Sequence, residues 1–201
     1  MIGPLDTDNF GNFDQIMQAC IKTGAYCAID IHNFARFNGK IIGQGGPTDA
    51  EFVDLWTQLA TAYANDTRVV FGLMNEPHDL DMDLWAATVQ KVVTAIRKIA
   101  PKQLILLPGA NFTSAGAVVS SGSGALLIKI TNPDKSTDGL ILDVHKYLDS
   151  DNSGTHAICV TDNVADAFTP LATFLRTNNR MAMVSETGAG SNTNVSGFSL
   201  V

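Results

Sequence analysis

Residues 68–79, RVVFGLMNEPHD, decide how the rest of the chain is interpreted. Val69, Val70 and Phe71 begin an apolar, β-branched run that is typical of a buried strand. The run ends at Asn75-Glu76-Pro77, where the proline favours a break in regular structure. A buried strand that delivers a carboxylate at its end matches the way a parallel α/β barrel presents a catalytic group. On this triplet alone, a solvated glutamate at a strand end is an equally good interpretation.

Size and charge exclude several classes of protein. The chain has 201 residues, 45% hydrophobic and 16% charged, which suits a globular protein with a buried core. Its net charge is −7 and none of its 13 basic residues forms a run, which argues against a nucleic-acid partner. No apolar stretch approaches the roughly 20 residues of a membrane span, so we expect no membrane partner. The first residues also lack the basic start and apolar core of a signal peptide.

The three cysteines leave the redox compartment open. Cys20 and Cys27 flank a predicted helix-to-strand turn and are close enough in sequence to be bridged, which leaves Cys159 over. Three free thiols in a cytosolic protein are an equally good interpretation of the count. Secretion is weakly favoured by three Asn-x-Ser/Thr sequons, at Asn65, Asn111 and Asn194.

Apolar spacing predicts alternating helices and strands. The predicted helices cover residues 10–22, 48–63, 84–100 and 162–177. The predicted strands cover residues 25–31, 69–74, 104–107, 140–144 and 181–185. Residues 34–47 read as a Gly-rich loop, and residues 114–130 as irregular chain with one short helix. This alternation predicts a parallel sheet of the α/β class.

Polar side chains follow one predicted strand after another. The strand ends fall near residues 32, 76, 109, 145 and 186. An open doubly wound sheet gathers its ligand groups at one switch point, whereas a TIM (β/α)8 barrel uses the ends of many strands. At this spacing eight units need roughly 300 residues. We therefore expect about five of the eight βα units, strands three to seven, so that residues 1–201 are a partial catalytic domain.

Glu76 and Glu186 end two different strands and are the predicted catalytic pair. The chain has no G-x-S-x-G elbow and no phosphate-binding loop, and its four histidines lack metal-ligand spacing. We therefore expect neither a metal nor a cofactor. Two carboxylates facing each other across a barrel rim are what glycoside hydrolysis requires.

Other residues at the strand ends have a functional and a structural interpretation. His32, Asn33, His145 and Tyr147 are predicted to tune the carboxylates and hold sugar hydroxyls, although His32 and His145 equally suit core histidines. Phe34, Phe37 and Phe112 are candidates for stacking on a sugar face. We assign Trp56 and Trp85 to packing, and His78 and His156 either to structural roles or to contacts that support the site residues. Asp30 and Asp143 lie inside strands and are weaker catalytic candidates.

Several motifs together resemble the fungal endoglucanases of glycoside hydrolase family 5. They are DIHNFARFNG (30–39), IIGQGGPT (41–48), FGLMNEPHD (71–79), WAATVQKVVTAIR (85–97), DVHKYLDSDNSGTH (143–156) and VSETG (184–188). The similarity extends from about Asp14 to Gly190. It implies a TIM barrel that cleaves internal β-1,4 bonds of cellulose or β-glucan with retention of configuration.

The resemblance also implies residue roles. Glu76 is then the general acid/base and Glu186 the nucleophile. Asn75 is expected to bind the 2-hydroxyl of the sugar, and Tyr147 to hydrogen-bond the nucleophile. The remaining implied substrate-binding residues are His32, Asn33, His145 and Phe112, the last standing where many relatives have tryptophan. The family pairs the positions of Cys20 and Cys27 in a disulfide and is secreted, so the signal peptide is expected to lie outside this chain.

The chain also departs from the family pattern. An arginine on an early strand and a tryptophan on the last strand have no counterpart, so we expect the first two strands and the last strand to be missing. The usual partner of Cys159 is absent too, and no carbohydrate-binding module is found. We expect a monomer at full length. The alternatives are a mannanase or β-1,3-glucanase of the same family, or an inactive carbohydrate-binding or interaction protein with open sheet edges.

Overall fold

A curved parallel sheet forms the centre of the computed structural model, which describes residues 3–160 and 162–190. Its five strands pair in the order β1-β4-β5-β6-β7, and every pairing is parallel. They are β1 (Cys27–Asp30), β4 (Val69–Gly72), β5 (Leu104–Pro108), β6 (Leu140–Tyr147) and β7 (Met181–Gly188). The strands follow one another across the sheet in the same order as along the chain. Because all of them are parallel, their carboxyl ends form one continuous rim. This is the predicted partial barrel.

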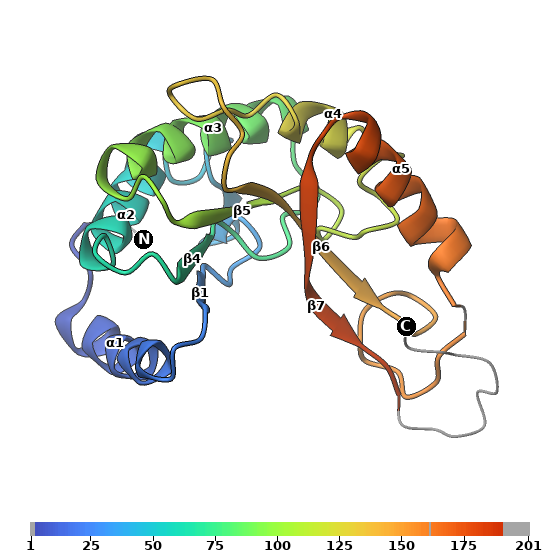
Figure 1. The fold of residues 1–201 in the computed structure, drawn as a ribbon, viewed down its shortest axis with the longest axis horizontal. Helices are drawn as coiled ribbons and strands as arrows, with labels where there is room; N and C mark the ends of the chain where they lie inside the picture. Colours follow the sequence, from blue (N-terminus) through green and yellow to red (C-terminus); the bar gives the residue numbers. More distant parts are fainter. Residues whose placement is uncertain (1–2, 161, 191–201) are drawn as a thin grey trace.

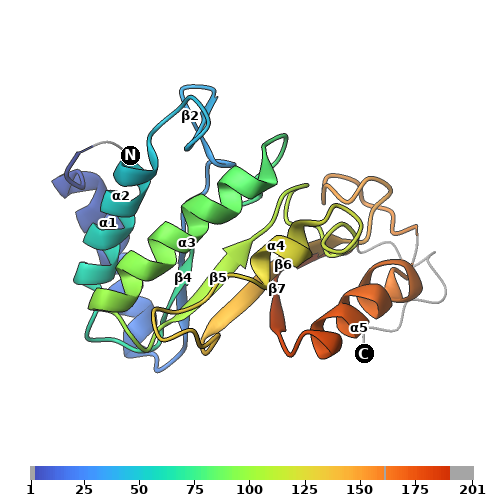
Figure 2. The same ribbon diagram turned by 90° about the horizontal axis from the view of Figure 1, so that it is seen from above.

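Helices cover the convex side of the sheet (Figures 1 and 2). They are α1 (Thr7–Lys22), α2 (Asp49–Ala62), α3 (Met82–Ile99), α4 (Ser123–Leu127) and α5 (Thr169–Thr177). The predicted helix at residues 162–177 is divided, because a π-helix, η1 (Val164–Phe168), precedes α5. Pro170 lies in the first turn of α5, where its missing N–H has no intrahelical partner to lose.

Local sequence signals explain where the helices begin. Thr48 caps α2 and forms a capping box with Glu51, so both side chains satisfy free amides of the first turn. Asp81 caps α3 in a similar way by accepting a hydrogen bond from the Leu84 amide. Gly24 follows α1 with a φ of +84°, a conformation that suits glycine at the end of a helix.

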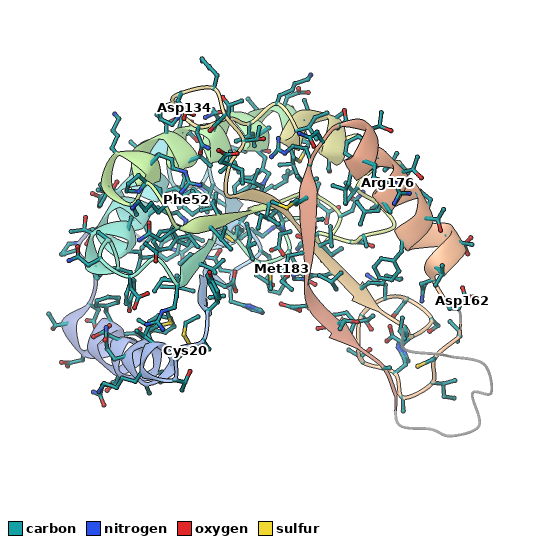
Figure 3. The ribbon with its side chains drawn as sticks, viewed as in Figure 1. Cys20, Phe52, Asp134, Asp162, Arg176 and Met183 are labelled. Atoms are coloured by element: carbon teal, nitrogen blue, oxygen red, sulfur yellow. A yellow bond between two sulfur atoms is a disulfide. The ribbon has the colours of Figure 1, made fainter. Side chains whose placement is uncertain are left out.

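Aromatic side chains fill the layer between helices and sheet. Phe52, Trp56, Phe71 and Trp85 are fully buried, and Figure 3 shows Phe52 in this layer. The Trp56 and Phe71 rings meet edge to face at 5.7 Å. Both tryptophans therefore have the packing role predicted for them. Their indole N–H groups also donate to the carbonyls of Leu73 and Pro108, which fixes the chain where β4 and β5 end.

Two predictions about the strands need correction. β6 and β7 are longer than predicted, so His145, Tyr147 and Glu186 lie within strands and not beyond their ends. The two strands continue because they pair with each other up to Tyr147 and Gly188. The predicted loop at residues 34–47 contains a small hairpin of β2 (Arg36–Phe37) and β3 (Lys40–Ile41). Asn38 and Gly39 turn it with positive φ values, as two-residue hairpin loops require.

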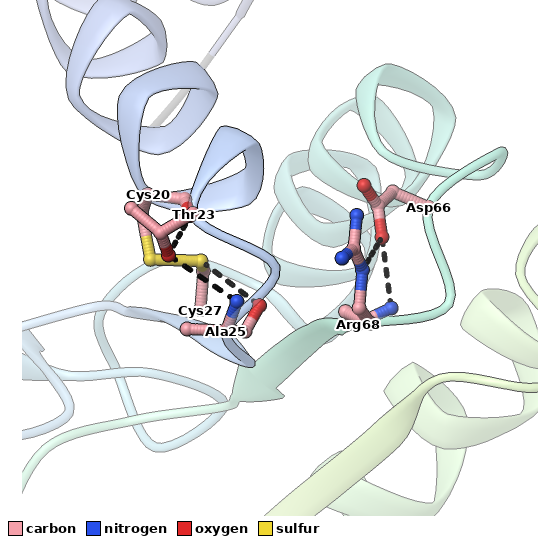
Figure 4. Close-up of a disulfide and its surroundings, with 6 residues drawn as sticks. All are labelled: Cys20, Thr23, Ala25, Cys27, Asp66 and Arg68. Atoms are coloured by element: carbon pink, nitrogen blue, oxygen red, sulfur yellow. Dashed lines mark hydrogen bonds and ion pairs between the residues drawn. A yellow bond between two sulfur atoms is a disulfide. The ribbon is translucent and has the colours of Figure 1, made fainter.

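A disulfide joins Cys20 at the end of α1 to Cys27 at the start of β1, as the family resemblance implied (Figure 4). Cys159 is a buried free thiol. The sequon at Asn194 lies outside the described residues. Among the helices that the structure describes, none combines the length and the apolar character needed to cross a membrane.

Candidate active site

Glu76 leaves the sheet through a tightly held segment after β4. The amide of Asn75 donates to the carbonyl of Ile31 at 2.9 Å, and the amide of Phe112 donates to the carbonyl of Pro77 at 3.1 Å. Between these anchors Glu76 has a φ of +43°, which is uncommon for a residue with a side chain. Such strained positions cluster at functional sites. Neighbouring strands therefore fix the direction of the Glu76 carboxylate.

A bulge on β7 brings Glu186 into register with His145. Val144 pairs with Val184, but the next pair is His145 with Glu186, so Ser185 is the extra residue. β-Bulges of this kind redirect side chains near active sites. The Ser185 hydroxyl donates to Asp143 Oδ1 at 2.5 Å, which holds the bulge against the middle of β6.

His145 lies between the two glutamates. Its Nδ1 is 2.9 Å from Glu76 Oε1 and 3.5 Å from Glu186 Oε2. The imidazole is 3% exposed, whereas the carboxylates of Glu76 and Glu186 are 21% and 32% exposed. One carboxylate oxygen from each glutamate and one nitrogen of His145 lie within 4.8 Å of one another. The structure thus brings the two predicted catalytic residues together and leaves both open to a ligand.

Tyr147, two residues beyond His145, contacts Glu186 directly. Its hydroxyl donates to Glu186 Oε2 at 2.9 Å. Burial, together with the hydrogen bond to Glu186, raises the pKa of Tyr147 to about 12. The phenol therefore keeps its proton and remains a donor at neutral and moderately alkaline pH.

Asp143 lies beneath this group and carries an unusual protonation equilibrium. The residue is 6% exposed, and its Oδ2 is 3.9 Å from His145 Nε2. Burial raises the pKa of Asp143 to about 6, against the lowering effects of Ser185 and His145. Burial also raises the pKa of Asp30 on β1, where His32 Nδ1 lies 2.9 Å from Asp30 Oδ2.

A groove opens beside Glu76. Its volume is about 520 Å³, and its lining residues are Glu76, Asn111, Phe112, Ser114, Ala117, Asp151, Asn152 and Ser153. The segment after β5 reaches this position by bonding to β6, since the amide of His145 donates to the Thr113 carbonyl and the amide of Ala115 to the His145 carbonyl. Phe112 is 47% exposed there and stacks on His78 at 4.3 Å.

His32 and Asn33 occupy the far end of an aromatic row along the rim. The His32 side chain is 62% exposed and meets Phe34 edge to face, and Phe34 meets His78 in the same way. Asn33 Oδ1 is buried without a hydrogen-bond partner, and Asn75 is 3% exposed. These predicted substrate-binding residues therefore share the rim with Glu76, but the described interactions include no contact of His32 or Asn33 with Glu76 or Glu186.

Some residues of the site were not singled out for it from the sequence. His78, assigned to a structural role, links Phe34 to Phe112 in the aromatic row. Ser185 reads only as a strand residue, and its role depends on the bulge. Asp151, Asn152 and Ser153 line the groove, because Asn152 Oδ1 accepts hydrogen bonds from Lys146 Nζ and the Tyr147 amide and draws the loop inward.

Two groups of potential metal ligands occur within residues 3–160 and 162–190. One consists of Glu76, His145 and Glu186 at the predicted active site, and the other of Asp149, Asp151 and His156. In the first group, His145 already bridges the two carboxylates, of which that of Glu76 lines the groove. The second group belongs to the loop between β6 and η1.

Comparisons of the sequence with known proteins find one family and several relatives named endoglucanases. The sequence model of the family described as Cellulase (glycosyl hydrolase family 5) matches residues 3–199. Endoglucanase EG-II of Hypocrea jecorina is 61% identical over 189 residues, which are 94% of this chain and 45% of that protein. A manganese dependent endoglucanase, Eg5A, of Phanerodontia chrysosporium is 49% identical over 192 residues, which cover 94% of this chain and 49% of that protein.

Among solved structures, Cel5A (EG2) of Hypocrea jecorina superimposes with a TM-score of 0.94 and 60% sequence identity. The match covers 95% of this chain and 58% of that one. The chain thus spans about half the length of the curated relatives it matches.

Proposed function

Because the chain belongs to the cellulase family, glycosyl hydrolase family 5, we propose that its protein is an endo-β-1,4-glucanase. The observation that carries this proposal is the close approach of Glu76 and Glu186, which each place a carboxylate oxygen within 4.8 Å of the other, with His145 between them. Retaining glycosidases hold their two carboxyl groups closer together than inverting enzymes, which leave room for a water molecule. We therefore propose a retaining reaction, as the family resemblance also implies.

The reaction proceeds in two displacements. Glu186 attacks the anomeric carbon while Glu76 gives its proton to the departing glycosidic oxygen, so that one C–O bond forms as the other breaks. Glu76 then removes a proton from water, which attacks the same carbon and releases Glu186. His145 holds both carboxylates in position, and the Tyr147 hydroxyl orients Glu186.

The substrate we propose is cellulose or a soluble β-1,4-glucan lying along the rim. Phe112 offers an exposed ring beside Glu76 for the face of a glucose unit. Asn75 is assigned to the 2-hydroxyl, and His32 and Asn33 to neighbouring hydroxyls. One relative is named a manganese dependent endoglucanase, but the two-carboxylate reaction proposed here is complete without a metal ion.

We further propose that the chain is part of the catalytic domain of a secreted, monomeric enzyme. The Cys20–Cys27 disulfide supports an oxidising compartment. The matched relatives are about twice as long as this chain, which supports further barrel units in the whole protein. The exposed apolar side chains on β7, Met181, Met183 and Val184, agree with a sheet face that further strands cover.

Substitution of the two glutamates in the full-length protein tests the assignment. Glu76→Gln and Glu186→Gln should each reduce release of reducing sugar from carboxymethyl cellulose by at least about 1,000-fold. With an aryl glycoside whose leaving group needs no protonation, Glu76→Gln should still release the aryl group in a burst, whereas Glu186→Gln should not. The surface variant Asp83→Asn should keep full activity.

Unchanged activity of either glutamate variant would refute the proposed pair. Substrate choice needs a separate measurement, because a mannanase or β-1,3-glucanase would use the same two carboxylates. A panel of soluble cellulose, mannan and laminarin distinguishes these enzymes, and we expect the highest kcat/KM on the cellulose derivative.

A further inference from the structure

The loop after β6 contains a second cluster of charged side chains, separate from the catalytic glutamates. His156 Nδ1 lies 3.2 Å from Asp149 Oδ2 and 3.4 Å from Asp151 Oδ1. One ligand atom from each of the three residues lies within 4.8 Å of the other two. The reaction proposed above assigns this cluster no role.

One oxygen of the cluster is buried without a partner. The Asp149 side chain is only 3% exposed. Its Oδ2 accepts hydrogen bonds from the His156 amide and the Ser153 hydroxyl and also contacts His156 Nδ1, whereas its Oδ1 has no hydrogen-bond partner. A buried carboxylate oxygen left unpaired is costly, and buried polar atoms in native proteins are satisfied with few exceptions. This oxygen therefore indicates a ligand that the protein itself does not supply.

The carboxylate that carries this oxygen is also ionised. Burial by itself would raise the pKa of Asp149, but hydrogen bonds led by the His156 amide outweigh it and lower the pKa well below its ordinary value. A hydrogen bond from the Ser153 side chain likewise lowers the pKa of Asp151. Hydrogen bonds from the surrounding loop thus favour the charged form of both carboxylates.

The local sequence has the spacing of a calcium-binding loop. Asp149, Asp151 and Gly154 occupy the first, third and sixth positions of the D-x-[DN]-x-[DN]-G order of ligands around a sharp turn, and Ser153 replaces the acid or amide at the fifth. Gly154 has the positive φ, +74°, that this turn needs. The twelfth position, a glutamate in the EF-hand, is Val160 here, and His156 lies where it supplies a nitrogen to the cluster instead.

We propose that Asp149, Asp151 and His156 bind one divalent cation of the oxygen-preferring class, Ca²⁺ or Mn²⁺. Three atoms that lie within 4.8 Å of one another are all within about 2.8 Å of a common point, close to the roughly 2.3–2.6 Å of calcium–oxygen bonds. Carboxylate ligands suit both ions, and Mn²⁺ also accepts the imidazole nitrogen. The cation satisfies Asp149 Oδ1 and balances the two negative charges.

A cation in this loop also stabilises one wall of the groove. Asp151 and Ser153 line the groove next to Glu76. Between them, Asn152 is fastened to β6 through its bonds with Lys146 and Tyr147. The bound cation therefore restrains the loop from one side while β6 restrains it from the other.

Direct binding measurements on the full-length protein, freed of metal with a chelator and held at pH 7.5, test this inference. Mn²⁺ binding is followed by electron paramagnetic resonance and Ca²⁺ binding by calorimetry. Each titration should show one filled site with a dissociation constant below about 1 mM. Asp151→Asn and His156→Gln should weaken binding at least tenfold. Both side chains are more than half exposed, so these variants are expected to fold.

Asp83→Asn removes one negative charge on α3 and should bind the cation as the unmodified protein does. The cation should raise the melting temperature of the unmodified protein and leave that of Asp151→Asn unchanged. Failure of both ions to bind at 5 mM would overturn the inference, and so would binding that Asp151→Asn and His156→Gln retain in full. Because binding is measured without substrate, this result is independent of the proposed glucanase activity.

Discussion

Tyr147 and Glu186 are joined across two neighbouring strands by a hydrogen bond of 2.9 Å from the phenol to Oε2. The bulge at Ser185 makes this contact possible, because it places Glu186 opposite His145 and Gly188 opposite Tyr147. A single extra residue in β7 thus turns a side chain of the sheet into a group held by both His145 and Tyr147.

Replacement of Tyr147 by phenylalanine should therefore slow the reaction more than it weakens the fold. A hydrogen bond to an ionised group contributes roughly 1.5–3 kcal/mol, so kcat should fall roughly 10- to 100-fold. Tyr26→Phe, at an exposed position before β1, is the matched control. A kcat equal to that of the control variant would contradict the role given to Tyr147.

Asp143 should make stability depend on pH. Its pKa is raised from 3.8 to about 6 by burial, so the folded state binds a proton more tightly than the unfolded state. The resulting stabilisation is complete below about pH 4 and is lost as the pH rises through 6, a change of about 3 kcal/mol at roughly 1.4 kcal/mol per pKa unit. Asp143→Asn, which retains an acceptor for Ser185, should remove much of this dependence.

Urea unfolding at pH 4.5 and pH 7 measures the effect of Asp143. The unmodified protein should lose free energy of unfolding between the two values, and Asp143→Asn should lose much less. An identical loss in both proteins would show that other groups cause it. Asp30, whose pKa burial also raises, contributes in the same direction and is not removed by this variant.

Phe112 should affect substrate binding more than chemistry. Its exposed ring lines the groove beside Glu76, supported from behind by His78. Phe112→Ala removes about 1 kcal/mol of stacking, which should raise KM about fivefold on soluble cellulose and leave kcat within twofold. Phe37→Ala is the comparison, since Phe37 lies on β2 and is not among the residues that line this groove. Equal effects of the two variants would remove the special role of Phe112.

The order of helices and strands was predictable because each buried element has a strong local pattern. The apolar run at residues 69–72 and the capping box of Thr48 with Glu51 are examples. The true ends of β6 and β7 were not predictable in this way. His145, Lys146 and Tyr147 are polar, but they continue the strand because β7 supplies backbone partners. Strand length at the rim is therefore a property of the pair, which one segment does not encode.

The positions of the two glutamates were predictable because each follows an apolar run, which is buried in β4 and largely exposed in β7. The family motifs predicted their contacts with Tyr147 and His145. The raised pKa of Asp143 depends on burial and on approach by Asp30 and Glu186, both distant in sequence. The row from His32 through Phe34 and His78 to Phe112 likewise combines residues from three loops. A search for pairs of histidines at metal-ligand spacing could not find the cluster of Asp149, Asp151 and His156, because it contains a single histidine.

The disulfide between Cys20 and Cys27 should stabilise the fold without assisting the reaction. It closes a loop of eight residues, for which the chain-entropy model gives about 2.5 kcal/mol. Cys27 is the first residue of β1, whereas His32 follows its other end, so the bond lies away from the rim. The double variant Cys20→Ser/Cys27→Ser should unfold at lower urea concentration and keep kcat within twofold at 25 °C. Reductant should lower the stability of the unmodified protein to that of the variant and leave the variant unchanged. Equal stability of the unmodified protein and the variant without reductant would contradict the prediction.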